Sequence, residues 1–153
     1  PNSQLNSVLV EELGKDWQDK FQKFEMKPIA AASIGQVHRA VTKDGIDVAV
    51  KVQYPGVAKS IDSDLNNLKR IFNYTNILPR TMFIDDLVRN IRIELKEETD
   101  YEKEAEKQMK FKELLKDYKD YYVPSVIKEL STKRILTTEW VNGVHRVVHW
   151  IIF

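Results

Sequence analysis

The 153-residue sequence contains no cysteine and only five glycines and five prolines. Without cysteine there are no disulfides and no thiolate-ligated metal sites. No apolar run reaches the ~20 residues that a membrane-spanning helix needs, and the apolar stretch at 147–153 is too short. An excess of charge of one sign is also missing, because 24 basic and 23 acidic residues leave a net charge of +1. We therefore expect no transmembrane segment in this chain and no nucleic-acid partner.

The chain begins at Pro1 and shows no charged segment followed by an apolar one. Because a piece of a longer protein can lose such a leader, its absence says little about location. A chain of this length, with 42% hydrophobic residues, can bury one core, so one domain is the default.

Residues 3–24 carry apolar side chains at mostly helical intervals, which predicts a helical opening segment. Pro28 ends this pattern, and a run of small residues follows from Ala30 to Gln36. Taken alone, the run is also compatible with the start of a short helix.

Residues 37–53 predict a β-hairpin. Asp44-Gly45 is a strong turn signal between the two strands. From Ile46 to Gln53 the residues alternate, so that Val48, Val50 and Val52 share one face of the strand and Ala49 and Lys51 share the other.

Two helical segments and two further strands follow the hairpin. One apolar stripe runs from Val57 to Phe72, and a second pattern starts at Leu87 and continues to about Tyr118. Residues 122–127 and 134–139 predict strands around a turn at 131–133. The order indicates an α+β fold in which helices flank one side of a twisted antiparallel sheet.

Lys51 lies at the end of a strand, on the same face as Ala49. In a nucleotide site the small alanine would leave room for a flat base, and the lysine would reach the phosphates. The alternative is a solvated edge lysine. Helical spacing places Glu104 on an apolar stripe facing the sheet, which makes it the best candidate to pair with Lys51.

The run at 30–36 precedes a strand, where phosphate-covering loops are usually rich in glycine. Its three alanines restrict the backbone, because each Cβ disfavours positive φ. Four segments together resemble the UbiB/ADCK family of atypical kinases. They are KPIAAASIGQVH (27–38), DVAVKVQYPGV (47–57), ETDYEKEA (98–105) and RILTTEWVNG (134–143). The resemblance covers residues 5–144 and is strongest to the mitochondrial coenzyme Q branch.

The resemblance implies the small lobe of a protein-kinase-like fold at 27–144, after an N-terminal helical segment at 1–26 and before a truncated tail at 145–153. It implies ATP as the cofactor, with Lys51 on the α- and β-phosphates and paired with Glu104. The remaining ATP-binding residues that it implies are Ala30, Ala31, Ala32, Ser33 and Gly35 over the phosphates, and Ala49, Glu139 and Val141 at the base. Glu98 and Asp100 match a family signature that faces the position where a protein kinase receives its peptide.

The family's Lys-x-Gly-Gln extension is not in this chain, and nothing after Gly143 resembles the large lobe with its catalytic Asp and metal-binding Asp-Phe-Gly. We therefore expect no catalytic residue and no metal ligand within the chain, Mg²⁺ only together with the large lobe, and no activity of the chain alone. His145 and His149 have a metal-binding spacing, but no third ligand is nearby.

The resemblance implies a nucleotide-binding lobe of an atypical kinase or ATPase that supports ubiquinone synthesis in mitochondria, with a substrate that is not a protein. Partners would be ATP and possible coenzyme Q biosynthetic proteins or lipid precursors. One alternative is a pseudokinase scaffold without catalysis. Another is a helical adaptor in which Lys51 and Glu104 form only a structural ion pair.

Overall fold

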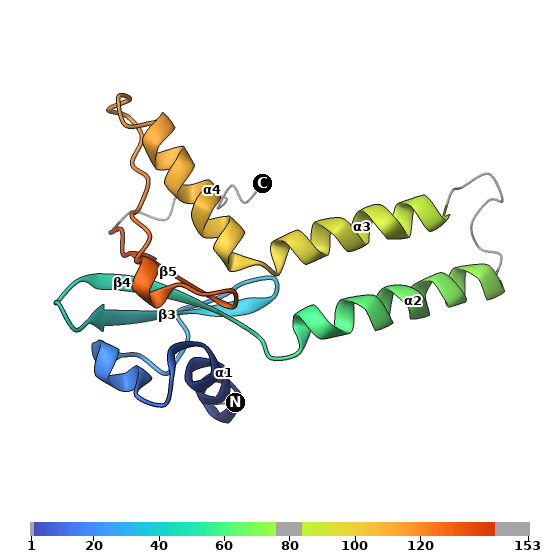
Figure 1. Cartoon of the computed structure of the whole chain (residues 1–153), viewed down its shortest axis with the longest axis horizontal. Helices are drawn as coiled ribbons and strands as arrows, with labels where there is room; N and C mark the ends of the chain where they lie inside the picture. The colour runs from blue at the N-terminus through green and yellow to red at the C-terminus, as the bar shows by residue number, and fades with distance from the viewer. Residues whose placement is uncertain (1, 76–83, 143–153) are drawn as a thin grey trace.

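The computed structural model describes residues 2–75 and 84–142 and is built around an antiparallel sheet (Figure 1). The strands are joined in the order β1-β3-β4-β5, and the short β2 pairs with β3 next to β1. Their bounds are β1 (Phe21–Phe24), β2 (Ala30–Ala31), β3 (Gly35–Thr42), β4 (Asp47–Gln53) and β5 (Ile135–Glu139). The helices are α1 (Asn2–Leu13), α2 (Val57–Thr75), α3 (Ile84–Glu98) and α4 (Tyr101–Leu114), with short 3-10 helices η1 (Trp17–Lys20) and η2 (Lys128–Leu130).

Strands β3 and β4 form the hairpin predicted at residues 37–53. Gly45 closes its turn with φ of 84°, a left-handed conformation that glycine adopts without steric cost. The predicted alternation is confirmed in β4, where Val48 and Val50 are fully buried and Lys51 is only partly buried. The strand therefore has one closed face and one open face.

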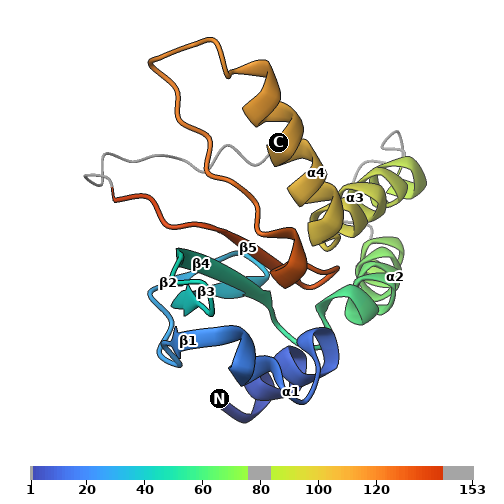
Figure 2. The same cartoon turned by 60° about the vertical axis from the view of Figure 1, so that its left-hand side comes forward.

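Helices α1 and α4 cover opposite faces of the sheet (Figure 2). Leu9 of α1 packs in one apolar cluster with Val50 of β4. On the other face, Tyr101 of α4 packs with Leu136 of β5. The sequence pattern predicted helices on one side only, and this prediction is wrong because α1 occupies the second face. The predicted α+β class, a sheet flanked by helices, is confirmed.

The N-terminal segment is helical only in part. Helix α1 ends at Leu13, and Gly14 follows with φ of 96°. The helical prediction is wrong at Phe21–Phe24, which forms β1 and pairs antiparallel with β3. Trp17, Phe21 and Phe24 pack edge-to-face, so their spacing is set by an aromatic cluster rather than by a helix. The boundary at residue 26 stays a prediction, although the sheet begins before it.

The single helix predicted from Leu87 to about Tyr118 is two helices. α3 ends at Glu98, and α4 starts at Tyr101. Asp100 is the N-cap of α4, and its carboxylate accepts a hydrogen bond from the Lys103 backbone N–H. Apolar residues continue on both sides of this break, but in α4 only Tyr101 and Ala105 are buried, and Phe111 is exposed. The break changes the direction of the chain, as Figure 1 shows, and brings α4 over the sheet.

Residues 122–127 do not form the predicted strand. They make an isolated bridge between Val126 and Thr138 of β5. Pro124 has no N–H to donate to a ladder, and the Ser125 N–H donates to the Glu139 carboxylate at 2.7 Å instead of to a strand. The second predicted strand, at 134–139, is confirmed as β5.

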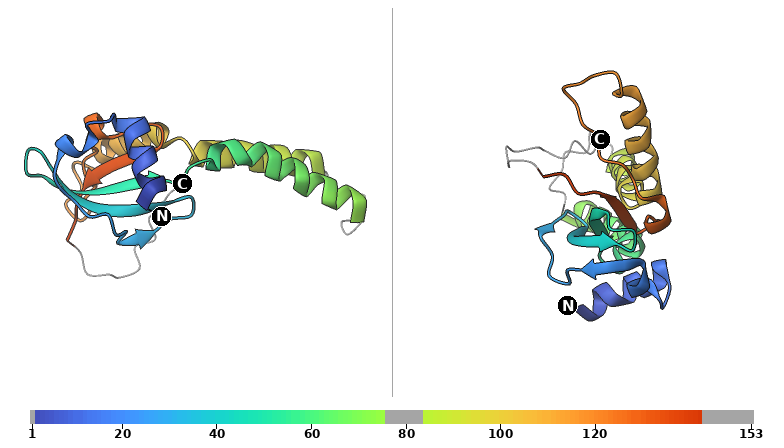
Figure 3. Two further views of the ribbon diagram at one scale, coloured as in Figure 1. Left: turned by 90° about the horizontal axis from the view of Figure 1, so that it is seen from below. Right: turned by 90° about the vertical axis from the view of Figure 1, so that its left-hand side faces the viewer.

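Helices α2 and α3 form a hairpin that extends away from the sheet (Figures 1 and 3). Ile61 and Leu65 of the predicted stripe are buried against Val88 of α3. In the described ranges no helix combines the length and apolarity that crossing a bilayer would require. The tail at 145–153, with His145 and His149, lies outside the described residues.

Candidate functional site

Lys51 and Glu104 form an ion pair between β4 and α4. The Lys51 Nζ lies 3.0 Å from Oε1 and 3.0 Å from Oε2 of Glu104. The side chains are 16% and 23% exposed, so the pair is shielded but reachable from solvent. Asp100 caps the helix that supplies Glu104. Because the cap fixes where this helix starts, it also fixes the position of Glu104 in the first turn. The predicted pairing of these two residues is confirmed as a contact.

Tyr101 lies under the same lysine and was not predicted from the sequence. Its ring centroid is 4.6 Å from the Lys51 Nζ, a cation–π geometry. The side chain is fully buried. Burial raises the pKa of the Tyr101 hydroxyl, and the charges of Glu104 and Glu98 raise it further, so the phenol stays neutral. The sequence feature that could have indicated Tyr101 is its position three residues before Glu104, at the start of the helix.

We call the surface around Lys51 the lysine face. Residues directly opposite each other on paired strands share a face. The members of the lysine face on β3, β4 and β5 are Val37, Arg39, Val41, Asp47, Ala49, Lys51, Leu136 and Thr138. The opposite surface, the valine face, contains the apolar residues Ala40, Val48, Val50, Val52 and Ile135 and, by the same register, Gln36, His38, Thr137 and Glu139.

The alanine-rich run lies along the edge of β3, next to the lysine face. Ala30 pairs with Val37 and Ala31 with Gln36, and both alanines are exposed. Val37 in turn pairs with Lys51, so the run is two strands away from the ammonium. The turn at its end closes with a hydrogen bond of 2.9 Å from the Ala32 N–H to the Gly35 carbonyl.

Gly35 is required by packing. A Cβ on this residue would lie 2.4 Å from the carbonyl oxygen of Val52 in the neighbouring strand. Ser33 is exposed, whereas Ile34 packs against the cluster that contains Tyr101. The one glycine of the run thus lets β3 approach β4, and this close approach accounts for it without any ligand.

Glu139 ends β5 and turns its side chain toward the 122–125 loop. Its carboxylate accepts hydrogen bonds from the Ser125 N–H at 2.7 Å and the Tyr122 hydroxyl at 3.0 Å. The hydrogen bond from Ser125 is the main reason that the pKa of Glu139 is lowered. Its backbone N–H donates to the Ser125 carbonyl at 2.9 Å. At Val141, 45% exposed, the N–H has no partner among the described residues.

Arg39 and Asp47 fix the segment that follows β5. The Arg39 guanidinium donates to both carboxylate oxygens of Asp47, at 3.1 and 2.6 Å, and this lowers the pKa of Asp47. The same guanidinium lies 4.9 Å from the ring centroid of Trp140, and the backbone N–H of Trp140 donates to the Asp47 carbonyl. A depression of about 220 Å³ lies here; it is lined by Lys23, Glu25, Arg39, Ala40, Val41 and Asp47.

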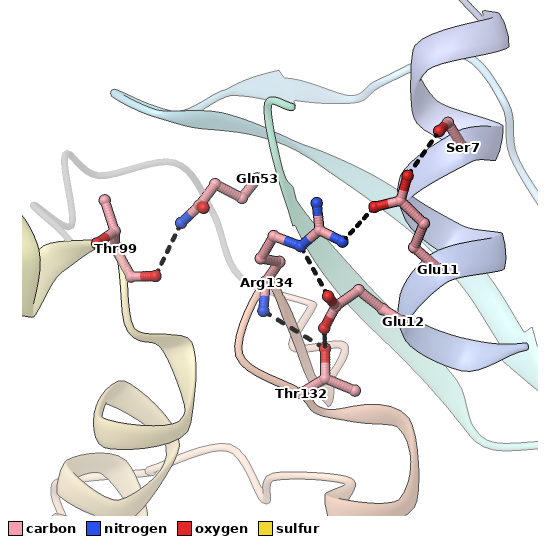
Figure 4. Close-up of polar contacts among 7 residues, drawn as sticks. All are labelled: Ser7, Glu11, Glu12, Gln53, Thr99, Thr132 and Arg134. Atoms are coloured by element: carbon pink, nitrogen blue, oxygen red, sulfur yellow. Dashed lines mark hydrogen bonds and ion pairs between the residues drawn. The ribbon is translucent and has the colours of Figure 1, made fainter. Parts of the chain in front are cut away.

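Polar contacts made by Gln53 and by Arg134 also join elements around the sheet (Figure 4). The buried Gln53 amide donates to the Thr99 carbonyl at 3.0 Å, which ties β4 to the break between α3 and α4. Arg134 donates from Nε to Glu12 at 2.7 Å and from a terminal nitrogen to Glu11 at 2.6 Å, which ties α1 to the start of β5.

The two signature acids have different surroundings. Glu98 is the exposed last residue of α3, and Asp100 caps α4 through the hydrogen bond from Lys103. The cap gives Asp100 a structural role in placing Glu104. The peptide-facing role implied for both residues stays a prediction.

A sheet lysine paired with a glutamate on a flanking helix, next to a strand-edge loop, defines the small lobe of a kinase-like protein. The chain belongs to the ABC1 atypical kinase-like family, whose model matches residues 1–148. The resemblance stated from the sequence motifs is thereby confirmed.

Curated relatives carry names from the same family. The chain is 54% identical over 94% of its length to "Atypical kinase coq-8, mitochondrial" of Caenorhabditis elegans, and covers 19% of that protein. It is 48% identical, again over 94% of its length, to "Atypical kinase COQ8, mitochondrial" of Saccharomyces cerevisiae and covers 28% of it. The chain therefore spans between 19% and 28% of the length of these relatives.

A solved structure shares the fold. It is described as "The complex structure of Rv3197-erythromycin from Mycobacterium tuberculosis" and matches with a TM-score of 0.74 at 35% identity. The match covers 94% of this chain and 36% of the other. The kinase-like small-lobe fold predicted from the sequence is confirmed by this match.

Proposed function

We propose that this chain is the nucleotide-binding lobe of an atypical kinase or ATPase and that ATP binds on its lysine face. The observation that carries the proposal is the shielded ion pair of Lys51 and Glu104. A lysine ammonium has three N–H donors, and two acceptor oxygens of Glu104 lie within 3.0 Å. The Lys51 side chain is partly exposed, and its third donor is available for phosphate oxygens.

The neighbouring residues fit the other parts of ATP. Ala49 is two positions before Lys51 on the same face, and its methyl group leaves space for a flat base. Val141 is exposed, and its N–H, which has no partner among the described residues, can donate to the edge of an adenine. The run from Ala30 to Gly35 forms an edge beside the phosphates. As for Lys51, we propose these contacts with ATP from the positions of the residues in the fold and from the chemistry of their groups.

In this proposal the described residues hold and orient the nucleotide. A Mg²⁺ ion bound with ATP would neutralise charge on the phosphates and stabilise phosphoryl transfer. In residues 2–75 and 84–142 no three His, Asp or Glu side chains are grouped as a metal site. We therefore assign neither the metal nor a catalytic base to any described residue.

The relatives' names suggest the biological role. Several proteins that are 47–54% identical to this chain are named mitochondrial COQ8 or coq-8 atypical kinases. We infer that the protein acts in mitochondria in support of coenzyme Q biosynthesis. We propose that the substrate of the enzyme is not a protein.

The test compares ATP binding by the wild-type chain and two lysine variants, measured by calorimetry and by thermal stabilisation. At a hundredfold excess over Kd, ATP should stabilise the wild type by about 2.7 kcal/mol. Lys51→Met should lower the affinity at least about tenfold, because it removes a charge-assisted contact. Lys15→Met, which alters an exposed lysine between α1 and η1, is the matched control and should bind as the wild type. Equal binding by Lys51→Met and wild type would refute the proposal.

A further inference from the structure

Tyr101 is the one fully buried aromatic side chain that contacts Lys51 among the described residues. It is the first residue of α4, one turn before Glu104. The lysine is thus contacted by two side chains of the same helical turn, a carboxylate and an aromatic face. Neither the sequence motifs nor the proposed ATP contacts give Tyr101 a role.

The backbone of Tyr101 is held independently of its hydroxyl. Its N–H donates to the Lys133 carbonyl at 3.0 Å, in the turn before β5. The preceding residue Asp100 caps the helix, and the Thr99 carbonyl accepts from the buried amide of Gln53. The break between α3 and α4 therefore places the ring, and three separate contacts fix that break.

The ring and the hydroxyl of Tyr101 differ in what they contact. The hydroxyl oxygen is buried and has no hydrogen-bond partner among the described residues. A buried polar group without a partner destabilises a fold, so the hydroxyl does not explain why the side chain lies here. The ring, in contrast, packs with Ala105 and Leu136 and presents its face to the ammonium at 4.6 Å.

The same cluster reaches the alanine-rich run. Ile34, which lies between Ser33 and Gly35, packs against the cluster of Tyr101, Ala105 and Leu136. One ring is therefore part of the apolar support for the run and also a contact of the lysine. This is the arrangement expected if the ammonium has to be held in one place relative to the run.

We propose that Tyr101 is a positioning residue that holds the Lys51 ammonium through its aromatic face, so that the ammonium is oriented for nucleotide phosphates. The proposal rests on the proposed ATP site for its functional part. A lysine side chain has four rotatable bonds, and ordering it costs conformational entropy. Contacts from a carboxylate and a ring restrict these rotations before ATP arrives, which lowers the cost of binding.

The first test needs no nucleotide. Protons above an aromatic face resonate upfield, so in the full chain the Lys51 ε-methylene signal should be shifted upfield in NMR spectra. Tyr101→Phe should keep the shift and Tyr101→Leu should abolish it. Leu9→Ala removes a fully buried side chain on the other face of the sheet and should leave the Lys51 signal unchanged. An ordinary Lys51 shift in the wild type would overturn the contact.

The second test measures ATP affinity in the same variants. Tyr101→Phe should bind within about twofold of the wild type, and Tyr101→Leu should bind about five- to thirty-fold more weakly, the range of a shielded cation–π contact. In a Lys51→Met background, Tyr101→Leu should have no further effect on affinity. An equal further loss in that background would show that Tyr101 acts through general packing and would overturn the proposal.

Isosteric variants keep the test valid if Tyr101→Leu does not fold. Fluorinated phenylalanines at position 101 preserve the ring shape while weakening the negative potential of its face. ATP affinity should fall stepwise with the number of fluorines, and an unchanged affinity would overturn the electrostatic role. If the wild type binds no ATP while the Lys51 signal is shifted, the proposed function fails and the contact between Tyr101 and Lys51 stands.

Discussion

The two faces of the sheet are made from alternate residues of the same strands and differ in what they cover. On the valine face, Val48 and Val50 are fully buried beneath α1. On the lysine face, one residue further along, Lys51 keeps a 16% exposed side chain and a charged partner. Because successive side chains of a strand point to opposite faces, the same strand provides an apolar face that contributes stability and a face with a partly exposed charged group.

This difference predicts separable effects of substitution. Changes on the valine face should alter stability and leave ligand contacts intact, because the sheet backbone lies between. Changes on the lysine face should alter nucleotide contacts at a smaller cost in stability, because its charged groups are partly hydrated. A variant that violates the separation would show where the two faces are coupled.

The largest effect is expected for Leu9→Ala in α1. Leu9 is fully buried in the cluster that covers the valine face, and truncating such a leucine costs roughly 3 kcal/mol through lost burial and a residual cavity. Urea denaturation would measure the change. Leu114→Ala, at a side chain that is 63% exposed, is the matched control and should change stability by less than about 0.5 kcal/mol. Comparable losses in both variants would show that α1 is not packed as described.

A second prediction concerns Gly35, where one substitution is expected to change both stability and ATP binding. An alanine Cβ there would lie 2.4 Å from the Val52 carbonyl oxygen, so Gly35→Ala must displace β3 from β4. We expect a loss of roughly 1–3 kcal/mol in stability, measured by denaturation, together with weaker ATP binding. Ala30→Ser, on the exposed β2, is the control and should keep stability near the wild type. Unchanged stability in Gly35→Ala would contradict the close approach of the strands.

Local sequence patterns were sufficient to predict how Lys51, Ala49 and Glu104 are arranged. The alternation in β4 predicted that Lys51 and Ala49 would share a face, and helical spacing selected Glu104 among the many acids of its segment. Both inferences depend on regular repeats, which a sequence displays directly. The ion pair they predicted is present at 3.0 Å.

The features that the sequence did not reveal depend on contacts between distant segments. The break before α4 is fixed by Gln53, 46 residues away from Thr99, and apolar residues continue on both sides of it. Tyr101 was missed for the same reason, because without the break its ring has no defined position relative to β4. At 122–127, alternation favoured a strand, but Glu139 takes the Ser125 N–H that a ladder would need.

The smallest of these effects is expected at the edge of the valine face, for Glu12→Gln. The Glu12 carboxylate accepts hydrogen bonds from Thr132 and Arg134. Burial acts to raise its pKa, but these hydrogen bonds outweigh burial and lower it from the ordinary value of 4.5. The substitution should cost about 1 kcal/mol at pH 7, because the Gln amide keeps an acceptor oxygen and only part of the charge-assisted contact is lost.

The pH dependence distinguishes this contact from simple packing. Because the folded-state pKa of Glu12 is lowered, its contribution is fully present above the ordinary pKa of 4.5 and is lost as the pH falls through the folded-state value. The difference in unfolding free energy between wild type and Glu12→Gln should therefore be constant near neutrality and shrink in acid. Exposed Glu106→Gln should show almost no difference at any pH. A difference between wild type and Glu12→Gln that persists well into acid would mean that the side chain acts by packing, and that α1 is attached to the valine face by its apolar residues alone.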